Sequence, residues 1–148
     1  MPGSTSINMP MKSYLVKFLT KKYGSYHKIN QSGLLGSYLI QLLSKDYKPK
    51  NTKVSEAAFF TIIFPKTVVE KSGFMITAEK MKQFEEFIKQ LFRHSLDVYI
   101  NITISKGLVV NVGQSVYEQD VMKAMKQFLD MYEITEDELK LDSLYRDY

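Results

Sequence analysis

Lysine and tyrosine side chains gather in one stretch of the 148-residue chain, from Lys12 to Lys53. The stretch holds nine lysines and a single acidic residue, Asp46. Lysine ammonium groups neutralise phosphates and tyrosine rings stack on bases, so this combination is typical of a nucleic-acid-binding surface. The candidate nucleic-acid-binding residues are Lys17, Lys21, Lys22, Lys28, Lys45, Lys48, Lys50, Lys53 and Tyr47. An ordinary solvated surface is the competing interpretation.

Arginine occurs only at Arg93 and Arg146. Bidentate recognition of guanine favours arginine over lysine. We therefore expect DNA or RNA to be bound with weak sequence specificity, and these residues favour neither of the two.

Few residues of the kinds that catalyse reactions or bind metals are present. The chain has no cysteine, which excludes a disulfide framework, a thiolate zinc site and a cysteine nucleophile. Its two histidines, His27 and His94, are far apart in sequence and lack the spacing of metal ligands. The segment Gly33–Ser37 lacks the lysine of a phosphate-binding loop and is better explained as a helix start. We therefore predict no catalytic residue, metal or cofactor, and a protein that is not an enzyme.

Acidic residues concentrate in Ser115–Tyr148, which holds nine acidic and four basic residues. The run Glu136-Asp137-Glu138 favours the first turn of a helix, because carboxylates stabilise a helix N-terminus. Such a helix would repel DNA phosphates, so packing within the fold or contact with a basic protein partner is the better prediction. The candidate protein-interaction residues are Glu136, Asp137, Tyr145 and Arg146. The basic and acidic ends either bind partners or attract each other within one fold, and both alternatives stay open.

The composition is that of a globular protein, with 45% hydrophobic and 24% charged residues. We expect a single globular domain over residues 12–148. Residues 1–11 are mostly small or polar, include two prolines and show no periodicity, which predicts a disordered leader. No run of 18 apolar residues and no signal peptide is visible, so we expect a cytoplasmic protein that does not enter a membrane.

Two helices and a short extended segment are predicted to position the lysines. Ser13 should cap the first helix, which ends at Gly24. Residues 25–32 should be extended and end in a turn. A second helix is expected over about Leu34 to Lys45, followed by a loop over Lys45–Lys53.

The apolar run Ala57–Phe64, closed by Pro65, is the clearest strand in the sequence. Its partner is expected in Ser25–Ile29 or in Val68–Met75, and both alternatives stay open. Thr77 should cap a long core helix whose apolar residues recur at helical spacing.

The second half of the chain is predicted to be helical, with one ambiguous segment. Asp97–Ser105 alternates like a strand but also continues the apolar stripe of the long helix, and helix is favoured. The alternative is a hairpin with Leu108–Val112. Two capping boxes, Ser115 with Glu118 and Thr135 with Glu138, predict two further helices separated by a very short turn.

These elements predict the α+β class: a mainly helical single domain with a small two- or three-stranded sheet built around Phe59–Phe64. We expect four or five helices. The predicted core residues are Leu39, Phe84, Ile88, Leu91, Phe92 and Phe128.

Several short motifs follow one another along residues 11–148: Lys22-Tyr23-Gly24, Leu34-Leu35-Gly36, a strand ending at Pro65, Phe128-Leu129 and Leu144-Tyr145-Arg146. Their order resembles that of small uncharacterised proteins of Bacteroidetes prophages and mobile elements. The resemblance implies a mobile-element setting, in which small basic proteins often bind nucleic acid or regulate. It implies no catalytic residue.

Two hypotheses of function follow from the residues. The first is a non-enzymatic nucleic-acid-binding accessory or regulatory protein of a phage or mobile element that uses the lysine-rich surface. The second is a protein-interaction or assembly module, whose basic and acidic ends join copies of the chain or bind a host or phage partner.

Overall fold

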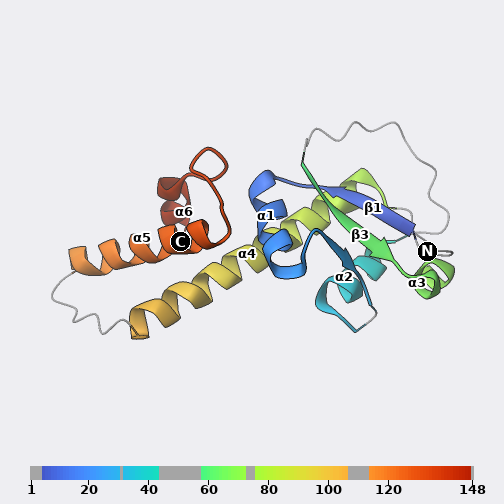
Figure 1. The fold of residues 1–148 in the computed structure, drawn as a ribbon, viewed down its shortest axis with the longest axis horizontal. Helices are drawn as coiled ribbons and strands as arrows, with labels where there is room; N and C mark the ends of the chain where they lie inside the picture. Colours follow the sequence, from blue (N-terminus) through green and yellow to red (C-terminus); the bar gives the residue numbers. More distant parts are fainter. Residues whose placement is uncertain (1–4, 31, 44–57, 73–75, 107–113, 148) are drawn as a thin grey trace. The chain divides into compact units, whose positions relative to one another are not determined.

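The computed structural model describes residues 5–30, 32–43, 58–72, 76–106 and 114–147, with the backbone alone described at residues 72, 105, 106, 114–119 and 147. These residues form three strands and six helices (Figure 1). In chain order the elements are β1 (Thr5–Pro10), α1 (Ser13–Tyr23), β2 (Tyr26–Lys28), α2 (Leu34–Leu42), β3 (Phe59–Phe64), α3 (Lys66–Ser72), α4 (Ala78–Lys106), α5 (Gln114–Met131) and α6 (Leu141–Asp147).

Helices predominate and accompany one small mixed sheet, which confirms the predicted α+β class. The internal contacts group the chain into two compact units, an N-terminal unit over Met1–Ile88 and a C-terminal unit over Lys89–Tyr148, with residues of α4 in both. One globular domain over residues 12–148 therefore stays a prediction. Among the described helices, none combines the length and the apolar character that crossing a bilayer requires.

The sheet belongs to the N-terminal unit and has the strand order β1-β3-β2. β1 runs antiparallel to the central strand β3 and β2 runs parallel to it, so that Asn8 and Tyr26 flank Thr61. The predicted central strand and its partner near residues 25–29 are confirmed. Alternate residues of β3 are buried, because one face of the sheet packs on the core.

The alternative partner, a strand over Val68–Met75, is wrong for the described part of that segment, which forms α3. The Pro65 carbonyl accepts hydrogen bonds from the backbone N–H groups of Val68 and Val69, at 3.0 and 3.1 Å. Proline suits a helix start, because it has no N–H to leave unpaired. Val68 is buried, so it contributes to the core from a helix and not from a strand.

The predicted disordered leader is wrong for residues 5–11, and residues 1–4 lie outside the described part. Residues 5–10 form β1 along β3, and the Met11 N–H donates to the Ala58 carbonyl at 3.1 Å. Met9 and Met11 are fully buried. Ile7, Met9 and Met11 are apolar at every second position, which is a strand pattern that the small and polar residues around them obscured.

Helix α1 begins at Ser13, so the prediction that Ser13 caps it is wrong. Lys12 occupies the cap position, and its backbone N–H donates to the Glu85 carboxylate of α4 at 2.9 Å. The helix ends at Gly24 as predicted. Gly24 has a φ of 90°, which favours glycine, and its N–H donates to the Thr20 carbonyl at 2.8 Å.

Helix α2 approaches the turn before it too closely for any side chain at Gly36. A Cβ there would collide with the backbone carbonyl oxygen of Asn30. Leu39 of α2 is buried as predicted, and Tyr38 stacks on Phe87 of α4 with ring centroids 4.1 Å apart. The helix ends at Leu42, and Leu43 is extended, so the predicted continuation toward Lys45 is wrong at Leu43; residues 44 and 45 lie outside the described part.

Helix α4 confirms the predicted long core helix and the helical interpretation of residues 97–105. The Thr77 hydroxyl accepts a hydrogen bond from the Lys80 N–H at 3.1 Å, which confirms Thr77 as the cap. A hairpin through residues 97–105 is therefore wrong, and its second strand lies outside the described residues. Of the core residues predicted here, Phe84, Ile88 and Phe92 are buried but Leu91 is only half-buried.

Helix α5 ends in a Schellman motif. The Ile134 N–H donates to the Leu129 carbonyl at 2.9 Å, and the Glu133 N–H donates to the Asp130 carbonyl at 3.1 Å. Glu133 has a φ of 58°, in the left-handed region where glycine is usual. Phe128 of α5 is buried as predicted. The predicted Ser115–Glu118 capping box involves side chains outside the described part.

The last helix begins at Leu141, so a helix opened by the Thr135 capping box is wrong. Glu138 does accept hydrogen bonds from the Thr135 N–H and Oγ1, at 3.1 and 3.0 Å. This pair closes only a single turn, in which the Leu139 N–H donates to the Thr135 carbonyl at 3.1 Å. Glu136 instead serves α6, because its carboxylate accepts the Leu141 N–H at 3.3 Å.

Candidate functional site

The described residues from β1 to β3 carry lysine as their only charged residue type. The lysines are Lys12, Lys17, Lys21, Lys22 and Lys28, and no aspartate or glutamate occurs among these residues. The described acidic residues of the N-terminal unit all lie on α3 or α4. The described residues of the sheet, α1 and α2 are therefore a cationic part of the N-terminal unit, to which we refer as the basic surface.

Helix α1 presents its lysines because its opposite side is in the core. Tyr14, Leu15, Phe18 and Leu19 are buried. Lys21 and Lys22 are exposed in the last turn, where cations also stabilise the helix dipole. The Lys22 Nζ lies 5.2 Å from the centroid of the Phe18 ring. Lys17 is half-buried and takes part in a further interaction.

Strand β2 continues the basic surface, because successive strand residues point to opposite faces. Tyr26 and Lys28 are exposed, whereas His27 between them is half-buried. The His27 ring lies 4.5 Å from the Tyr23 ring, between centroids. Burial lowers the pKa of His27, so its imidazole is neutral at pH 7.

The structure brings together only part of the predicted nucleic-acid-binding set. Lys17, Lys21, Lys22 and Lys28 lie on α1 and β2, two elements in contact with each other. The other five predicted residues lie outside the described part of the chain: Lys45, Tyr47, Lys48, Lys50 and Lys53.

The outer face of the sheet carries two exposed rings, Tyr26 and Phe59, of which sequence reasoning missed Phe59. Tyr26 and Phe59 are exposed to 57% and 52%, unusually high values for aromatic side chains in a sheet. The sequence assigned Phe59 to a hydrophobic run. The signal was Thr61, a polar residue two positions later in the same strand, which marks that side of β3 as outward-facing.

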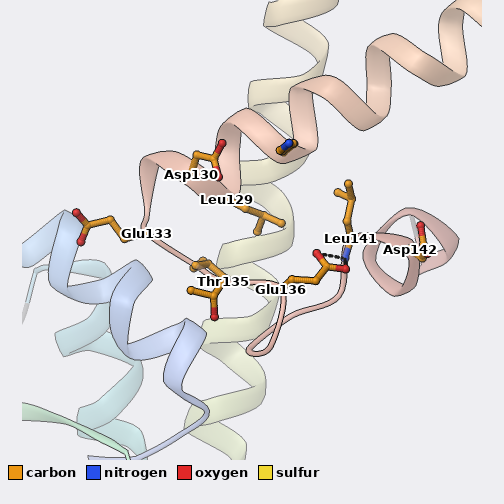
Figure 2. A pocket seen from close by; sticks show the side chains of 9 residues that line it. Leu129, Asp130, Glu133, Thr135, Glu136, Leu141 and Asp142 are labelled. Carbon is orange, nitrogen blue, oxygen red and sulfur yellow. Dashed lines mark hydrogen bonds between the residues drawn. The ribbon is translucent and has the colours of Figure 1, made fainter.

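An acidic cleft of about 560 Å³ lies in the C-terminal unit where α5 gives way to α6 (Figure 2). Its apolar part is formed by Leu129, Ile134 and Leu141. Its charged lining consists of Asp130, Glu133, Glu136, Asp142 and Lys126. Sequence reasoning found Glu136 but missed the others, because the turn after α5 and not a continuous helix brings them together.

The predicted protein-interaction residues lie on this part of the C-terminal unit. Glu136 lines the cleft and caps α6, and Asp137 is exposed in the turn after it. Tyr145 is half-buried and Arg146 exposed on α6. In the described part of the chain, no three histidine, aspartate or glutamate side chains converge as a metal site requires.

Comparison of the chain with models of protein families, with curated proteins and with solved structures finds no match. The residues and their geometry therefore carry the argument about function.

Proposed function

We propose that this protein is a non-enzymatic, nucleic-acid-binding accessory or regulatory protein of a phage or mobile element. It holds phosphates with the basic surface of the N-terminal unit. The observation that carries the proposal is the absence of any acidic residue among the described residues from β1 to β3, where five lysines lie. The resemblance to proteins of Bacteroidetes mobile elements supplies the biological setting.

Electrostatics supports the choice of an anionic polymer as ligand. Lysines that neutralise phosphates release condensed counterions, so affinity falls steeply as salt rises. Exposed Lys21, Lys22 and Lys28 can each approach a phosphate, because two of them end α1 and the third lies on the strand that follows. Lysine offers a point charge and no bidentate fork, so sequence specificity is weak.

Charge reversal tests the proposal. Changing Lys21, Lys22 and Lys28 together to glutamate should weaken binding of labelled DNA or RNA about 10- to 100-fold at low salt. Fluorescence anisotropy at about 50 and 200 mM salt measures the affinity and its salt dependence. The matched control reverses Lys71, Lys82 and Lys123, which are also exposed but lie on α3, α4 and α5.

The control has the same total charge as the test variant. Equal losses of affinity in the two variants would show that net charge alone matters and would contradict a localised site. Undetectable binding by the unmodified protein at low salt would overturn the proposal altogether.

The acidic cleft favours assembly through complementary ends as a second candidate function. An apolar floor with carboxylates around it suits a lysine side chain, whose stem is apolar and whose head is cationic. Another copy's basic surface could supply that lysine. Light scattering should then show mass rising with concentration, and Asp130→Asn with Asp142→Asn should abolish the rise. A chain that stays monomeric at high concentration would contradict self-assembly.

A further inference from the structure

We infer that the outer face of the sheet is a stacking platform for single-stranded nucleic acid, with the rings of Tyr26 and Phe59 as its base-binding elements. This inference rests on the proposed function and specifies the ligand class.

The two faces of the sheet differ in burial. On the inner face, Met9 of β1 and Phe60, Ile62 and Phe64 of β3 are buried in the core. The outer face holds the alternate residues. They are Ser6, Asn8 and Pro10 of β1, Phe59, Thr61 and Ile63 of β3, and Tyr26 and Lys28 of β2. Most sheets that face water on one side are polar there, so two exposed rings call for an explanation.

The two rings are neighbours on this face. Tyr26 lies beside Thr61, and Phe59 precedes Thr61 by two residues on the same side of β3. Tyr26 and Phe59 are thus diagonal neighbours on adjacent strands, within reach of aromatic side chains. Both side chains are more than half exposed, which leaves ring surface on which a flat base can lie.

Charge complementarity selects the occupant. Lys28 lies on the same face, beside Ile63, and is exposed. The eight outer-face residues include no acidic side chain, and the lysines that end α1 precede β2 by a few residues. A phosphate backbone that follows β2 would meet cations while its bases turn toward β3.

Polar groups on the same face could contact base edges. The Thr61 hydroxyl donates to the side-chain amide oxygen Oδ1 of Asn8 at 2.8 Å, which fixes the orientation of the Asn8 side chain. Its amide nitrogen, a donor, then points away from Thr61 on an exposed residue. One such donor gives little discrimination among bases, in keeping with weak sequence specificity.

Stacking on side chains requires unpaired bases. In a duplex the bases are already stacked inside the helix, so rings on a protein surface contact only strands whose bases are free. The platform therefore predicts preference for single strands over a duplex of the same sequence, which lysines alone would not give.

Ring substitutions test the platform by anisotropy with a labelled oligothymidine and a duplex of equal length. Tyr26→Ala and Phe59→Ala should each weaken single-strand binding about 5- to 150-fold. Duplex affinity and the slope of affinity against salt should stay unchanged, because no cation is removed. Tyr26→Phe and Phe59→Tyr should restore binding, and Leu34→Ala, which removes an equally exposed apolar side chain from α2, should have no effect.

Fluorescence supplies a second readout, because the chain has no tryptophan. Tyr26→Trp introduces a single indole whose emission a stacked base should quench on addition of oligothymidine. Leu34→Trp is the matched control and should keep its emission. The platform would be overturned if oligothymidine did not quench the indole. It would also be overturned if the alanine variants of the two rings kept their affinity for oligothymidine while the triple lysine variant lost it. Either result would leave the proposed function standing. Failure of the unmodified protein to bind either strand type would overturn both. Capture of a protein or a second copy by the ring face, without oligothymidine binding, would also overturn the platform.

Discussion

The N-terminal and C-terminal units differ in both architecture and charge. The N-terminal unit holds the whole sheet, and its described residues from β1 to β3 have lysine as their only charged type. The C-terminal unit is helical, and four carboxylates line the cleft where α5 gives way to α6. The net charge of +4 thus conceals two surfaces of opposite sign. A polyanion should therefore bind to the N-terminal unit, and a cationic partner to the C-terminal unit.

The two units also have separate aromatic clusters, and the largest expected effect comes from breaking one of them. Phe128 packs against Phe92, Tyr99 and Tyr132, with centroids 5.5, 5.6 and 4.8 Å away. Phe128→Ala should lower the free energy of unfolding by about 3 to 5 kcal/mol. Hydrogen exchange at the amides of α5 measures the loss.

The same experiment compares the units. If residues 12–148 unfold as one domain, the amides of β3 should lose equal protection, whereas loss confined to α5 would contradict a single domain. Met131→Ala, which removes a side chain that is about half exposed from the same helix, should change the free energy of unfolding by less than about 0.5 kcal/mol.

A smaller loss is expected from crowding the N-terminal unit. Gly36→Ala places a methyl group against the Asn30 carbonyl and should lower the free energy of unfolding by about 1 to 3 kcal/mol. Urea denaturation followed by circular dichroism measures it. In Gly33→Ala the added methyl group contacts only the Asn30 side chain, which can move, so the free energy of unfolding should fall clearly less. Equal losses in the two variants would refute the close approach of α2 to the turn.

Relief of backbone strain should stabilise the C-terminal unit. Glu133 adopts a positive φ in the Schellman motif, so Glu133→Gly should raise the free energy of unfolding by about 0.5 to 1 kcal/mol. Thermal denaturation checks the sign. A fall in melting temperature would show that the contacts of the Glu133 side chain outweigh the strain.

The smallest effect concerns pH. Burial lowers the pKa of His27 below its ordinary value of 6.5, so the unfolded chain binds the proton more readily. His27 should therefore stabilise the fold fully above pH 6.5, and this contribution should be lost as the pH falls below that value. His27→Gln should flatten the dependence of the free energy of unfolding on pH, as measured by urea denaturation between about pH 5 and pH 8. His94→Gln, at an exposed position of α4, is the control.

Periodic patterns predicted much of the fold. The stripe of α4 runs over so many turns that the strand-like alternation of residues 97–105 could not outweigh it, and residues 59–64 are apolar enough to be a strand in any context. β1 was missed because its pattern is short and its stability comes from pairing with β3, some fifty residues away. The pairing of β1 with β3 cannot be recognised from the residues of β1 alone.

The candidate site was predictable only as a charge distribution. The lysines on α1 and β2 could be predicted from the sequence, because their clustering in the chain is visible without a structure. The exposure of Phe59 was missed, because it depends on which face of the sheet the helices cover and the single polar residue Thr61 was a weak signal for that face. The cleft around Leu141 was also missed, because the capping box at Thr135 predicted a helix directly after that residue. The helix α6 begins only at Leu141.

Nuclear magnetic resonance of the labelled full chain, titrated with oligothymidine, tests the central claim most directly, because it reports on both units at once. The account predicts that the largest amide shifts occur at Lys21, Lys22, Tyr26 and Lys28, with the amides of α5 and α6 unchanged. Shifts confined to α5 and α6, or spread evenly over both units, would contradict a nucleic-acid site on the basic surface.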